Sequence, residues 1–481
     1  MDHLPTDAEP NKPGTGSNAS RTPVGASPHE EPYVLPDEPR VSTSVRRRVE
    51  GCYNRLARTG LPQPLESLLL AEFDLDVSAD YGGLPIRNPW GKASGQLSMT
   101  DTQVAEDVAA GLGFIVLKTV IAQDAMGQQT MHEWAPREAR MVVEPIVGRS
   151  GRRGWTVTWK GRGWWKSFDE YLELIRIARS LASRNSPAEP PTLIVPSCKY
   201  HLPASADEPW RHGEYEYTTQ RLLEAWQKEG PAQENTPMPL EKDFSPTLAG
   251  DERAGQQEQV LRWLRTVPQL IRQAAVGSDG CVKTESQAAR AERAVTASCP
   301  VHVGLKIFNA LFDDAFQIAM LRAIHEPGGD RPDFYIYADR LFDPNREFDG
   351  KRGVAYGGPD LSDRNLRVMT QFAALCRTGQ ITSPLPWSAT GNIESGRMAL
   401  EYALRGATSF QLHTFFQLPA SEFDMQSGPR TDKVLHKLYF HPESGFVVWM
   451  HHLAEVLSLP RRPLRFRDVV GRLELLPPGA G

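Results

Sequence analysis

Residues 385–416, LPWSATGNIESGRMALEYALRGATSFQLHTFF, hold the pattern that decides the fold. Two short apolar segments flank a helical pattern that ends at Gly406, and glycine commonly follows the last turn of a helix. The first segment runs into the small-residue turn ATGN, and the second ends in His413-Thr414. A strand, a helix and another strand in this order predict two parallel strands joined by a helical crossover.

The same alternation of strand and helix patterns extends back to about residue 84. The predicted strands are residues 85–94, 114–120, 191–198, 238–245, 301–308, 333–339, 385–390 and 408–414. Helical patterns lie between most of them, and the one at 167–184 begins with a capping box. Eight strands alternating with helices predict an α/β fold of the (β/α)8 TIM-barrel class. A doubly wound open sheet is the main competitor, but its usual G-x-G-x-x-G fingerprint is absent near the first strand.

Composition divides the chain into four predicted parts. Residues 1–43 contain eight prolines and almost no periodic apolar residues, so we expect a disordered tail. Residues 44–83 are predicted to form a helical extension, residues 84–460 the barrel, and residues 461–481 a C-terminal tail. The helices expected at 44–75 could cap one end of the barrel or form the face of a homodimer.

Three long segments, residues 121–166, 203–237 and 246–300, follow the second, third and fourth strands as predicted insertions. Loops that follow barrel strands lie on the catalytic face, so we expect some of this material to roof the active site. Pro268 interrupts a helical pattern in the third segment, which predicts a kinked or split helix.

The bulk composition argues against several classes of protein. Lys and Arg number 54 against 59 Asp and Glu, a net charge of −5 that gives no reason to expect a nucleic-acid partner. The five cysteines are scattered without a CxxC pair, so no metal site or Fe–S cluster is expected. No apolar run approaches the length of a membrane span, and the N-terminus lacks a secretory pattern. We therefore expect a cytoplasmic protein that acts on a small molecule, without stable membrane insertion.

The ends of the last two predicted strands are suited to binding a phosphate group. Strands seven and eight end side by side in a barrel, which would bring the ATGN and His-Thr turns together. Small residues there let backbone N–H groups approach a phosphate, and the next helix start adds a partial positive charge. The candidate residues are Gly391, Asn392, His413 and Thr414. Two ordinary strand-to-helix turns remain the alternative interpretation.

Two lysines stand out because each interrupts an apolar strand pattern. Lys118 lies in FIVLKTV and Lys306 lies in VHVGLKIF, where an unpaired ammonium group would be costly. Both are therefore candidate site residues. A strand-end lysine that reaches solvent is one alternative, and a lysine aldolase that forms a Schiff base with its substrate is another.

Five segments, in order along residues 84–416, resemble the dihydroorotate dehydrogenase family. This family of FMN-binding barrels also includes the pyrimidine-reducing domain of dihydropyrimidine dehydrogenase. RNPWGKASG resembles the family's first-strand N-P-x-x-x-A-S-G, and GLGFIVLKTV resembles its second-strand G-x-G-x-x-x-x-K-T. PVHVGLKIF resembles the fifth-strand P-V-x-V-K, and GVAYGGPDLS resembles a variant of G-G-L-S-G. SATGNIESGRMALEYALRGATSFQLHT resembles the ending G-x-G-G-I…G-A…V-Q-x-x-T.

The resemblance implies that FMN lies across the strand ends, with its phosphate in the ATGN and His-Thr turns. The positions that match the family's FMN-binding residues are Ala93, Ser94, Gly95, Lys118, Thr119, Lys306, Gly357, Gly358, Gly391, Asn392, His413 and Thr414. The two lysines would stabilise negative charge on the reduced flavin. His413 replaces a residue that is usually Gly, so we expect a tighter pocket or a charge-assisted contact.

The departures from the family fall where the substrate should bind. The fourth strand of the family normally ends E-x-N-x-S-C-P-N, whereas LEKDFSPTL places Asp243 at the Asn position and has no Cys after Ser245. The sixth strand places Asp339 at a second Asn position, followed by Arg340. Carboxylates only accept hydrogen bonds when ionised, so Asp243 and Asp339 are expected to change the substrate. Cys198 becomes a candidate base if the strand register differs.

The leading interpretation is an FMN-dependent oxidoreductase that acts on a CH–CH bond of a pyrimidine-like or other cyclic substrate. Its catalytic candidates are Ser245 and Asp243 as the base and Lys118 beside the flavin. The resemblance leaves two alternatives open, a non-catalytic flavin- or phosphate-binding barrel and the lysine aldolase.

Overall fold

The computed structural model describes residues 32–136, 141–159, 163–186, 188–228, 236–244, 256–276, 299–310, 312–328, 331–460 and 463–476. These residues belong to one unit, Pro32–Gly481. The main sheet contains β4 (Trp90–Lys92), β5 (Phe114–Val116), β6 (Val120–Ile121), β9 (Leu193–Val195), β10 (Ser197–Lys199), β11 (Met238–Asp243), β12 (Val301–Ala310), β13 (Phe334–Phe348), β14 (Lys351–Tyr356), β15 (Trp387–Thr390) and β16 (Ala407–Leu412). All eight predicted strand positions are therefore strands.

The main sheet curls into a TIM-barrel-like arrangement. Its hydrogen-bonded path runs β6-β10-β11-β12-β13-β15-β16-β4-β5-β9, and every pairing along it is parallel. Two successive parts of the second strand pair with two successive parts of the third, β5 with β9 and β6 with β10. The two ends of the path therefore belong to neighbouring strand positions, as a (β/α)8 barrel requires.

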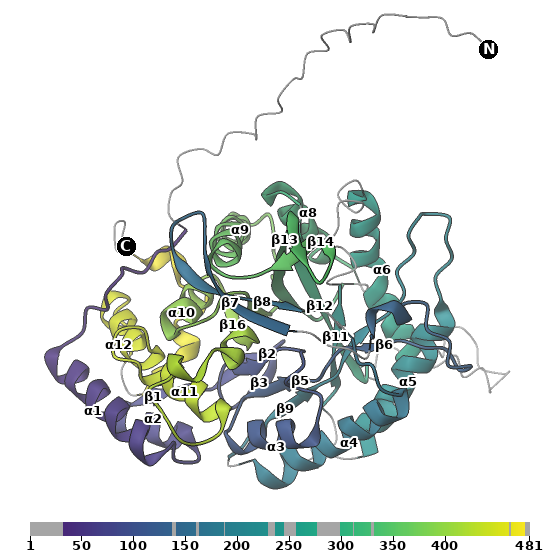
Figure 1. The fold of residues 1–481 in the computed structure, drawn as a ribbon. Helices are drawn as coiled ribbons and strands as arrows, with labels where there is room; N and C mark the ends of the chain where they lie inside the picture. The colour runs from purple at the N-terminus through teal and green to yellow at the C-terminus, as the bar shows by residue number, and fades with distance from the viewer. Residues whose placement is uncertain are drawn as a thin grey trace, which may run out of the picture. The chain divides into compact units, whose positions relative to one another are not determined.

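Amphipathic helices cover the outside of the sheet (Figure 1). They are α1 (Thr43–Thr59), α2 (Leu65–Phe73), α3 (Asp101–Ala109), α4 (Phe168–Asn185), α5 (His212–Lys228), α6 (Gln257–Val276), α8 (Asp314–Ile324), α9 (Pro359–Arg377), α10 (Gly396–Leu404), α11 (Arg430–Phe440) and α12 (Phe446–Val456). The predicted capping box begins α4, where Ser167 Oγ accepts a hydrogen bond from Glu170 N at 3.2 Å. None of the described helices combines the length and apolar character that a bilayer-spanning helix needs.

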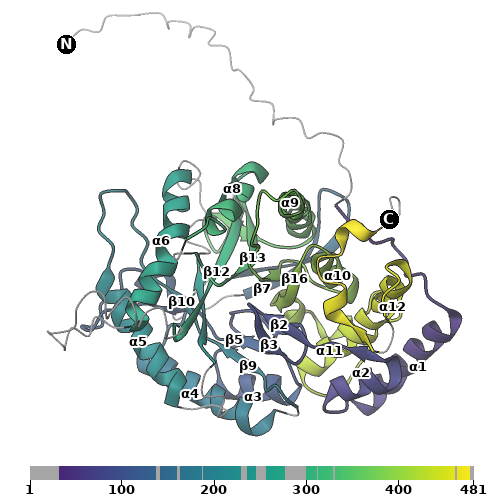
Figure 2. The same cartoon turned by 180° about the vertical axis from the view of Figure 1, so that it is seen from behind.

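A short hairpin of β2 (Ala79–Tyr81) and β3 (Leu84–Ile86) closes the amino-terminal end of the sheet (Figure 2). The Tyr81 ring packs against Phe114 and Phe334, which begin β5 and β13. The Tyr81 hydroxyl donates to the carboxylate of Glu241, and Gln411 donates to the same oxygen. This buried network fills the centre of the sheet at its amino-terminal end.

Two further hairpins lie at the carboxyl end. The first joins β7 (Met141–Val147) to β8 (Arg153–Trp159) within the predicted insertion at 121–166, and it crosses the front of the sheet in Figure 1. The second extends β13 to Phe348 and returns along β14. No insertion after the sixth strand was predicted, so this second hairpin is a new feature.

The structure differs from two predicted boundaries. Residues 32–42 belong to the same unit as the sheet, so the tail predicted for 1–43 extends too far along the chain. Leu464, in the predicted C-terminal tail, pairs with Leu75 through β17 (Leu464–Arg465) and β1 (Leu75–Asp76). The helix with Pro268 was predicted to be kinked or split; it is not split, because α6 includes the proline, and the kink stays a prediction. The remainder of the first predicted tail, residues 1–31, lies outside the described residues.

Candidate functional site

A cavity of about 450 Å³ lies among the carboxyl ends of the strands. Its volume falls within the range of small-molecule sites, roughly 300–1,000 Å³. Its wall includes thirteen residues that carry the sequence-based hypothesis: Ala93, Ser94, Lys118, Thr119, Asp243, Lys306, Asp339, Gly357, Gly358, Gly391, Asn392, His413 and Thr414. Positions far apart in the chain therefore meet in one cavity.

Three other candidates are placed differently. Gly95 is not part of the cavity wall, although it lies directly behind the His413 side chain. Cys198 is fully buried on β10 and does not line the cavity, and its burial raises the pKa of the thiol far above the usual range. Cys198 is therefore unsuited to act as the base. Ser245 lies outside the described residues.

The ATGN turn has the backbone geometry that its sequence predicts. Gly391 has φ +107° and Asn392 has φ +54°, a left-handed value that asparagine tolerates better than most side chains. A Cβ atom at residue 391 would lie 2.9 Å from Asn365 Nδ2, so only glycine fits there without displacement. Asn365 Nδ2 in turn donates to the carbonyl of Thr390 at 3.0 Å. The turn is thus held from behind while its other side faces the cavity.

Sequence reasoning missed Glu394, which follows this turn and lines the cavity. Burial raises the pKa of Glu394 to about 7, although the hydrogen bond from the backbone N–H of Trp155, at 3.1 Å, opposes that shift. The carboxyl group is therefore partly protonated near neutral pH. The only signal for Glu394 in the sequence was an acidic residue directly after a turn whose small residues favour an anion.

The two predicted lysines both face the cavity but differ in their titration. Burial lowers the pKa of Lys118 to about 7, although the charge of Asp243 opposes the shift. Burial alone would lower the pKa of Lys306 too, but the carboxylates of Asp339, Glu241 and Asp243 outweigh it and raise this pKa. Lys306 is a cation throughout the physiological range, whereas Lys118 changes charge near neutral pH.

A chain of hydroxyl groups reaches Asp243 from three neighbouring strand positions. Asp243 ends β11 and pairs in register with Lys306 on β12. Its Oδ2 atom accepts from Thr119 Oγ1 at 3.4 Å. Thr119 Oγ1 also lies 2.8 Å from Ser94 Oγ and 3.0 Å from Ser197 Oγ. A proton taken up by the carboxylate can therefore be shared with a polar chain along the cavity wall.

His413 occupies the space beside Gly95. A Cβ atom at residue 95 would overlap the His413 imidazole, so the glycine is required by this close approach. Burial lowers the pKa of His413 well below its usual range, and the positive charges of Arg340, Lys118 and Lys306 add to the effect. The imidazole is neutral at pH 7. A neutral imidazole can still donate to an anion, so the tighter pocket and the charge-assisted contact both stay predictions.

Several polar atoms of the cavity wall lack protein partners. Thr158 Oγ1, Asn392 Oδ1 and Gln411 Oε1 are buried, and none has a hydrogen-bond partner among the residues that the structure describes. Leaving such atoms unpaired costs roughly 1–3 kcal/mol each. A ligand that supplies hydrogen-bond donors would recover this free energy, so the wall is suited to a polar molecule.

Both carboxyl-end hairpins contribute to the roof. Thr158 of β8 lines the cavity, and Arg340 donates to the carbonyl of Val157 at 2.8 Å. The second hairpin contributes its tip, where Asp349 and Gly350 have φ values of +53° and +71°. Asp-Gly in a two-residue loop is a strong hairpin signal, and it would have revealed this part of the roof in the sequence.

No protein-family model matches this chain, and no curated protein matches its sequence. Among solved structures, the chain is similar to a dihydroorotate dehydrogenase from Eimeria tenella, determined in complex with ferulenol. The two share 13% sequence identity at a TM-score of 0.50, over 89% of this chain and 95% of the other. At this identity the likeness shows the fold alone, a dihydroorotate dehydrogenase-like α/β architecture.

Proposed function

We propose that the cavity binds FMN and that the protein is an oxidoreductase of the dihydroorotate dehydrogenase-like type. The bound flavin would supply hydride transfer at N5, to or from a CH–CH bond of a pyrimidine-like or other cyclic substrate. The observation that carries the proposal is the convergence of Lys118, Lys306 and the Gly391-Asn392 turn on a single cavity. The likeness to a solved dihydroorotate dehydrogenase supports it at the level of the fold.

The end of the cavity formed by the ATGN turn fits a phosphate group. Backbone N–H groups at Gly391 and Asn392 can approach an anion because residue 391 has no side chain. Asn392 Oδ1 is buried without a partner among the described residues and would accept from a ribityl hydroxyl. An ionised Glu394 would repel the phosphate. Because the pKa of Glu394 is about 7, its carboxyl group can be protonated and uncharged when the phosphate binds.

The part of the wall formed by Ala93, Ser94 and the two lysines fits a planar ring that gains negative charge. Ala93 and Ser94 present small side chains, which leave room for a flat ring system. Lys306 keeps its positive charge because three carboxylates raise its pKa. A fixed cation in a buried site stabilises charge that develops during hydride acceptance. Lys118 adds a second cation below pH 7.

Asp243 is the base that we propose. It lies on the cavity wall, accepts from Thr119, and can take the proton that leaves or joins the substrate carbon. Asp339 lies on the same wall and can accept a ring N–H of the substrate. Two carboxylates in place of amides favour a neutral substrate rich in N–H donors over an anionic one.

The test is a panel of neutral cyclic amides, dihydropyrimidines among them, added to the FMN-loaded protein while flavin absorbance is followed under anaerobic conditions. In the wild type, we expect a reduced substrate to bleach the visible absorbance of the flavin. Asp243→Asn should slow it by roughly 10²–10⁴-fold, the usual contribution of a general base. FMN binding should persist in this variant because the base does not hold the cofactor.

Two outcomes would contradict the proposal in different ways. FMN uptake without bleaching by any member of the panel would favour the non-catalytic flavin-binding barrel. Borohydride trapping of a carbonyl substrate on Lys118 or Lys306, with no FMN uptake, would favour the aldolase.

A further inference from the structure

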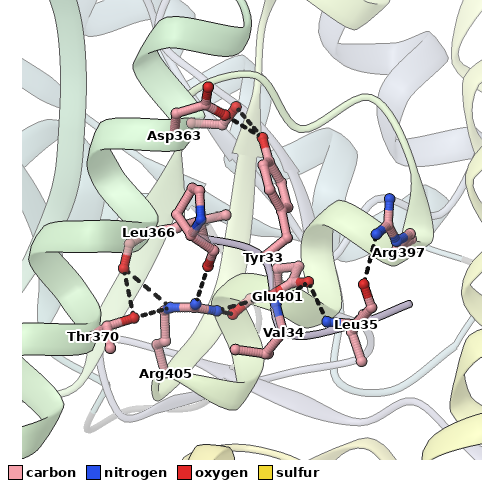
Figure 3. Close-up of polar contacts among 11 residues, drawn as sticks. Tyr33, Val34, Leu35, Asp363, Leu366, Thr370, Arg397, Glu401 and Arg405 are labelled. Carbon is pink, nitrogen blue, oxygen red and sulfur yellow. Dashed lines mark hydrogen bonds and ion pairs between the residues drawn. The ribbon is translucent and has the colours of Figure 1, made fainter. Parts of the chain in front are cut away.

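The chain segment Pro32–Asp37, here called the strap, lies across α9 and α10 and is fixed by a buried ion pair (Figure 3). Glu401 of α10 and Arg405, which directly follows the helix, are 2.9 Å apart, and both side chains are fully buried. Glu401 Oε1 accepts from Val34 N at 3.0 Å and from Leu35 N at 2.8 Å. Arg405 Nη2 donates to the carbonyl of Pro32 at 2.6 Å. Arg405 Nε also donates to Leu366 and Thr370 of α9, so the ion pair joins the strap backbone to both α9 and α10.

Tyr33 is the one large side chain that the strap places towards α9. It is 9% exposed, and its hydroxyl donates to Asp363 Oδ1 at 2.5 Å and lies 3.2 Å from Ser362 Oγ. Charge-assisted hydrogen bonds of this kind are roughly twice as strong as neutral ones. Figure 3 shows the Tyr33 ring reaching from the strap to the Asp363 carboxylate.

From Ser362 the contacts continue to the anion-binding turn. Ser362 Oγ accepts from Asn392 Nδ2 at 2.9 Å, and its own proton is shared between the carbonyl of Pro359, at 2.9 Å, and the Tyr33 hydroxyl oxygen, at 3.2 Å. Asn392 has left-handed φ and lines the cavity. The strap therefore reaches the turn through one tyrosine hydroxyl and one serine hydroxyl.

The strap also reaches the roof. The guanidinium carbon of Arg152, at the start of the β7–β8 hairpin's second strand, lies 4.0 Å from the centroid of the Tyr33 ring. Ser150 Oγ, in the hairpin turn, donates to Asp363 Oδ2 at 2.8 Å. Asp363 is thus shared between the strap and the hairpin, one oxygen to each. Losing the Tyr33 hydroxyl would detach the strap from the carboxylate that also anchors the hairpin turn.

We propose that Tyr33 is a positioning residue of the ligand site: the strap holds the Gly391-Asn392 turn and the β7–β8 roof in the geometry that binds the anionic end of the ligand. This inference rests on the proposed function for the identity of the ligand, but not for the positioning itself. Cofactor-free protein should show the same dependence on Tyr33, because the contacts are all within the chain.

The test compares two tyrosine-to-phenylalanine variants of the full chain. Tyr33→Phe removes the hydroxyl and keeps the ring against Arg152. The matched control is Tyr53→Phe, since Tyr53 OH also donates to a carboxylate, Asp424 Oδ2, at 2.5 Å, and neither residue lines the cavity. The first readout is amide hydrogen exchange at residues 391–394 and 153–158 in cofactor-free protein. The second is the FMN dissociation constant from fluorescence quenching.

Tyr33→Phe should accelerate exchange at both segments about tenfold and weaken FMN binding by about as much, as expected for the loss of one charge-assisted hydrogen bond. Tyr53→Phe should leave both at the wild-type values. Ser362→Ala cuts the link to Asn392 and leaves the hydrogen bond from Tyr33 to Asp363 in place, so it should reproduce the effect at 391–394. If Tyr33→Phe does not fold, this serine variant carries the test alone.

The outcomes separate the two proposals. Unchanged exchange at 391–394 in both Tyr33→Phe and Ser362→Ala would overturn the positioning role. Accelerated exchange in these variants, with no FMN uptake by the wild type, would support the strap and contradict the proposed cofactor. Equal acceleration in Tyr53→Phe would reduce Tyr33 to a general stabilising contact and also overturn the inference.

Discussion

At the scale of single residues, the charges that face the cavity set how ligand binding responds to pH. Burial lowers the pKa of Lys118 to about 7 and raises the pKa of Glu394 to about 7. As pH rises through 7, Lys118 loses a charge that attracts an anion and Glu394 gains a charge that repels one. Both changes weaken FMN binding, each by up to about tenfold per pH unit. We expect the FMN dissociation constant to rise between pH 6 and pH 8.

Isothermal titration across this pH range, with buffers of different ionisation enthalpy, would also show proton uptake on binding. Lys118→Met and Glu394→Gln should each reduce the pH dependence, whereas Lys242→Met is the matched control. Burial likewise lowers the pKa of Lys242 to about 7, but Lys242 does not line the cavity. Comparison among variants cancels the titration of the ligand's own phosphate near pH 6. Affinity that is independent of pH would contradict this assignment.

The close approach of His413 and Gly95 gives a second prediction. Gly95→Ala should lower the free energy of unfolding by about 1–3 kcal/mol, because its methyl group would overlap the imidazole. His413→Gly in the same chain should remove most of this cost, and a double-mutant cycle by urea unfolding measures the coupling. Gly51→Ala is the control, since a Cβ there meets no atom within 4 Å. Additive effects of Gly95→Ala and His413→Gly on the free energy of unfolding would show that the contact between residues 95 and 413 does not form.

The sequence predicted the residues whose role is local. Gly391 was predictable because a tight turn after a strand favours a residue without a side chain. The two lysines were predictable because each places a charge inside an apolar run. Glu394 and Thr158 could not be found in this way, since their burial depends on which segments meet above the strands. The titration of Lys118 likewise follows from its burial in the fold.

At the scale of elements, the β2–β3 hairpin supplies a group that the sheet interior needs. Glu241 is fully buried, and the Tyr81 hydroxyl is one of its two donors. Tyr81→Phe should lower the free energy of unfolding by about 1–3 kcal/mol, since a buried carboxylate loses a partner. Tyr335→Phe is the control, because the Tyr335 hydroxyl is buried without a partner among the described residues. Equal losses in urea unfolding for both variants would contradict this role of Tyr81.

Elements with strong periodicity were predicted well, and elements held by distant contacts were not. The helix α4 has its apolar spacing and its capping box in the sequence. The β13–β14 hairpin was missed although its Asp-Gly turn is a clear local signal. Residues 32–42 were assigned to a tail because their composition is polar and proline-rich. Their order depends on Glu401 and Arg405, which lie more than 300 positions along the chain.

At the scale of the whole chain, the alternation of strands and helices was enough to predict the curled parallel sheet, because parallel strands need helical crossovers. Parallel strands end at the same edge of the sheet, which explains why residues from five motifs meet in one cavity. Which ligand fills the cavity was beyond the sequence. Its wall combines the two lysines with the carboxylates of Asp243 and Asp339.

The most direct test of the central claim is the visible spectrum of the full-length protein after incubation with FMN and removal of excess ligand. We predict a yellow protein that retains about one FMN per chain, with a shifted flavin band and quenched fluorescence. Lys306→Met should lower this occupancy, because it removes a buried cation that keeps its charge across the physiological pH range. A folded protein that stays colourless and leaves the FMN spectrum unchanged would contradict the account.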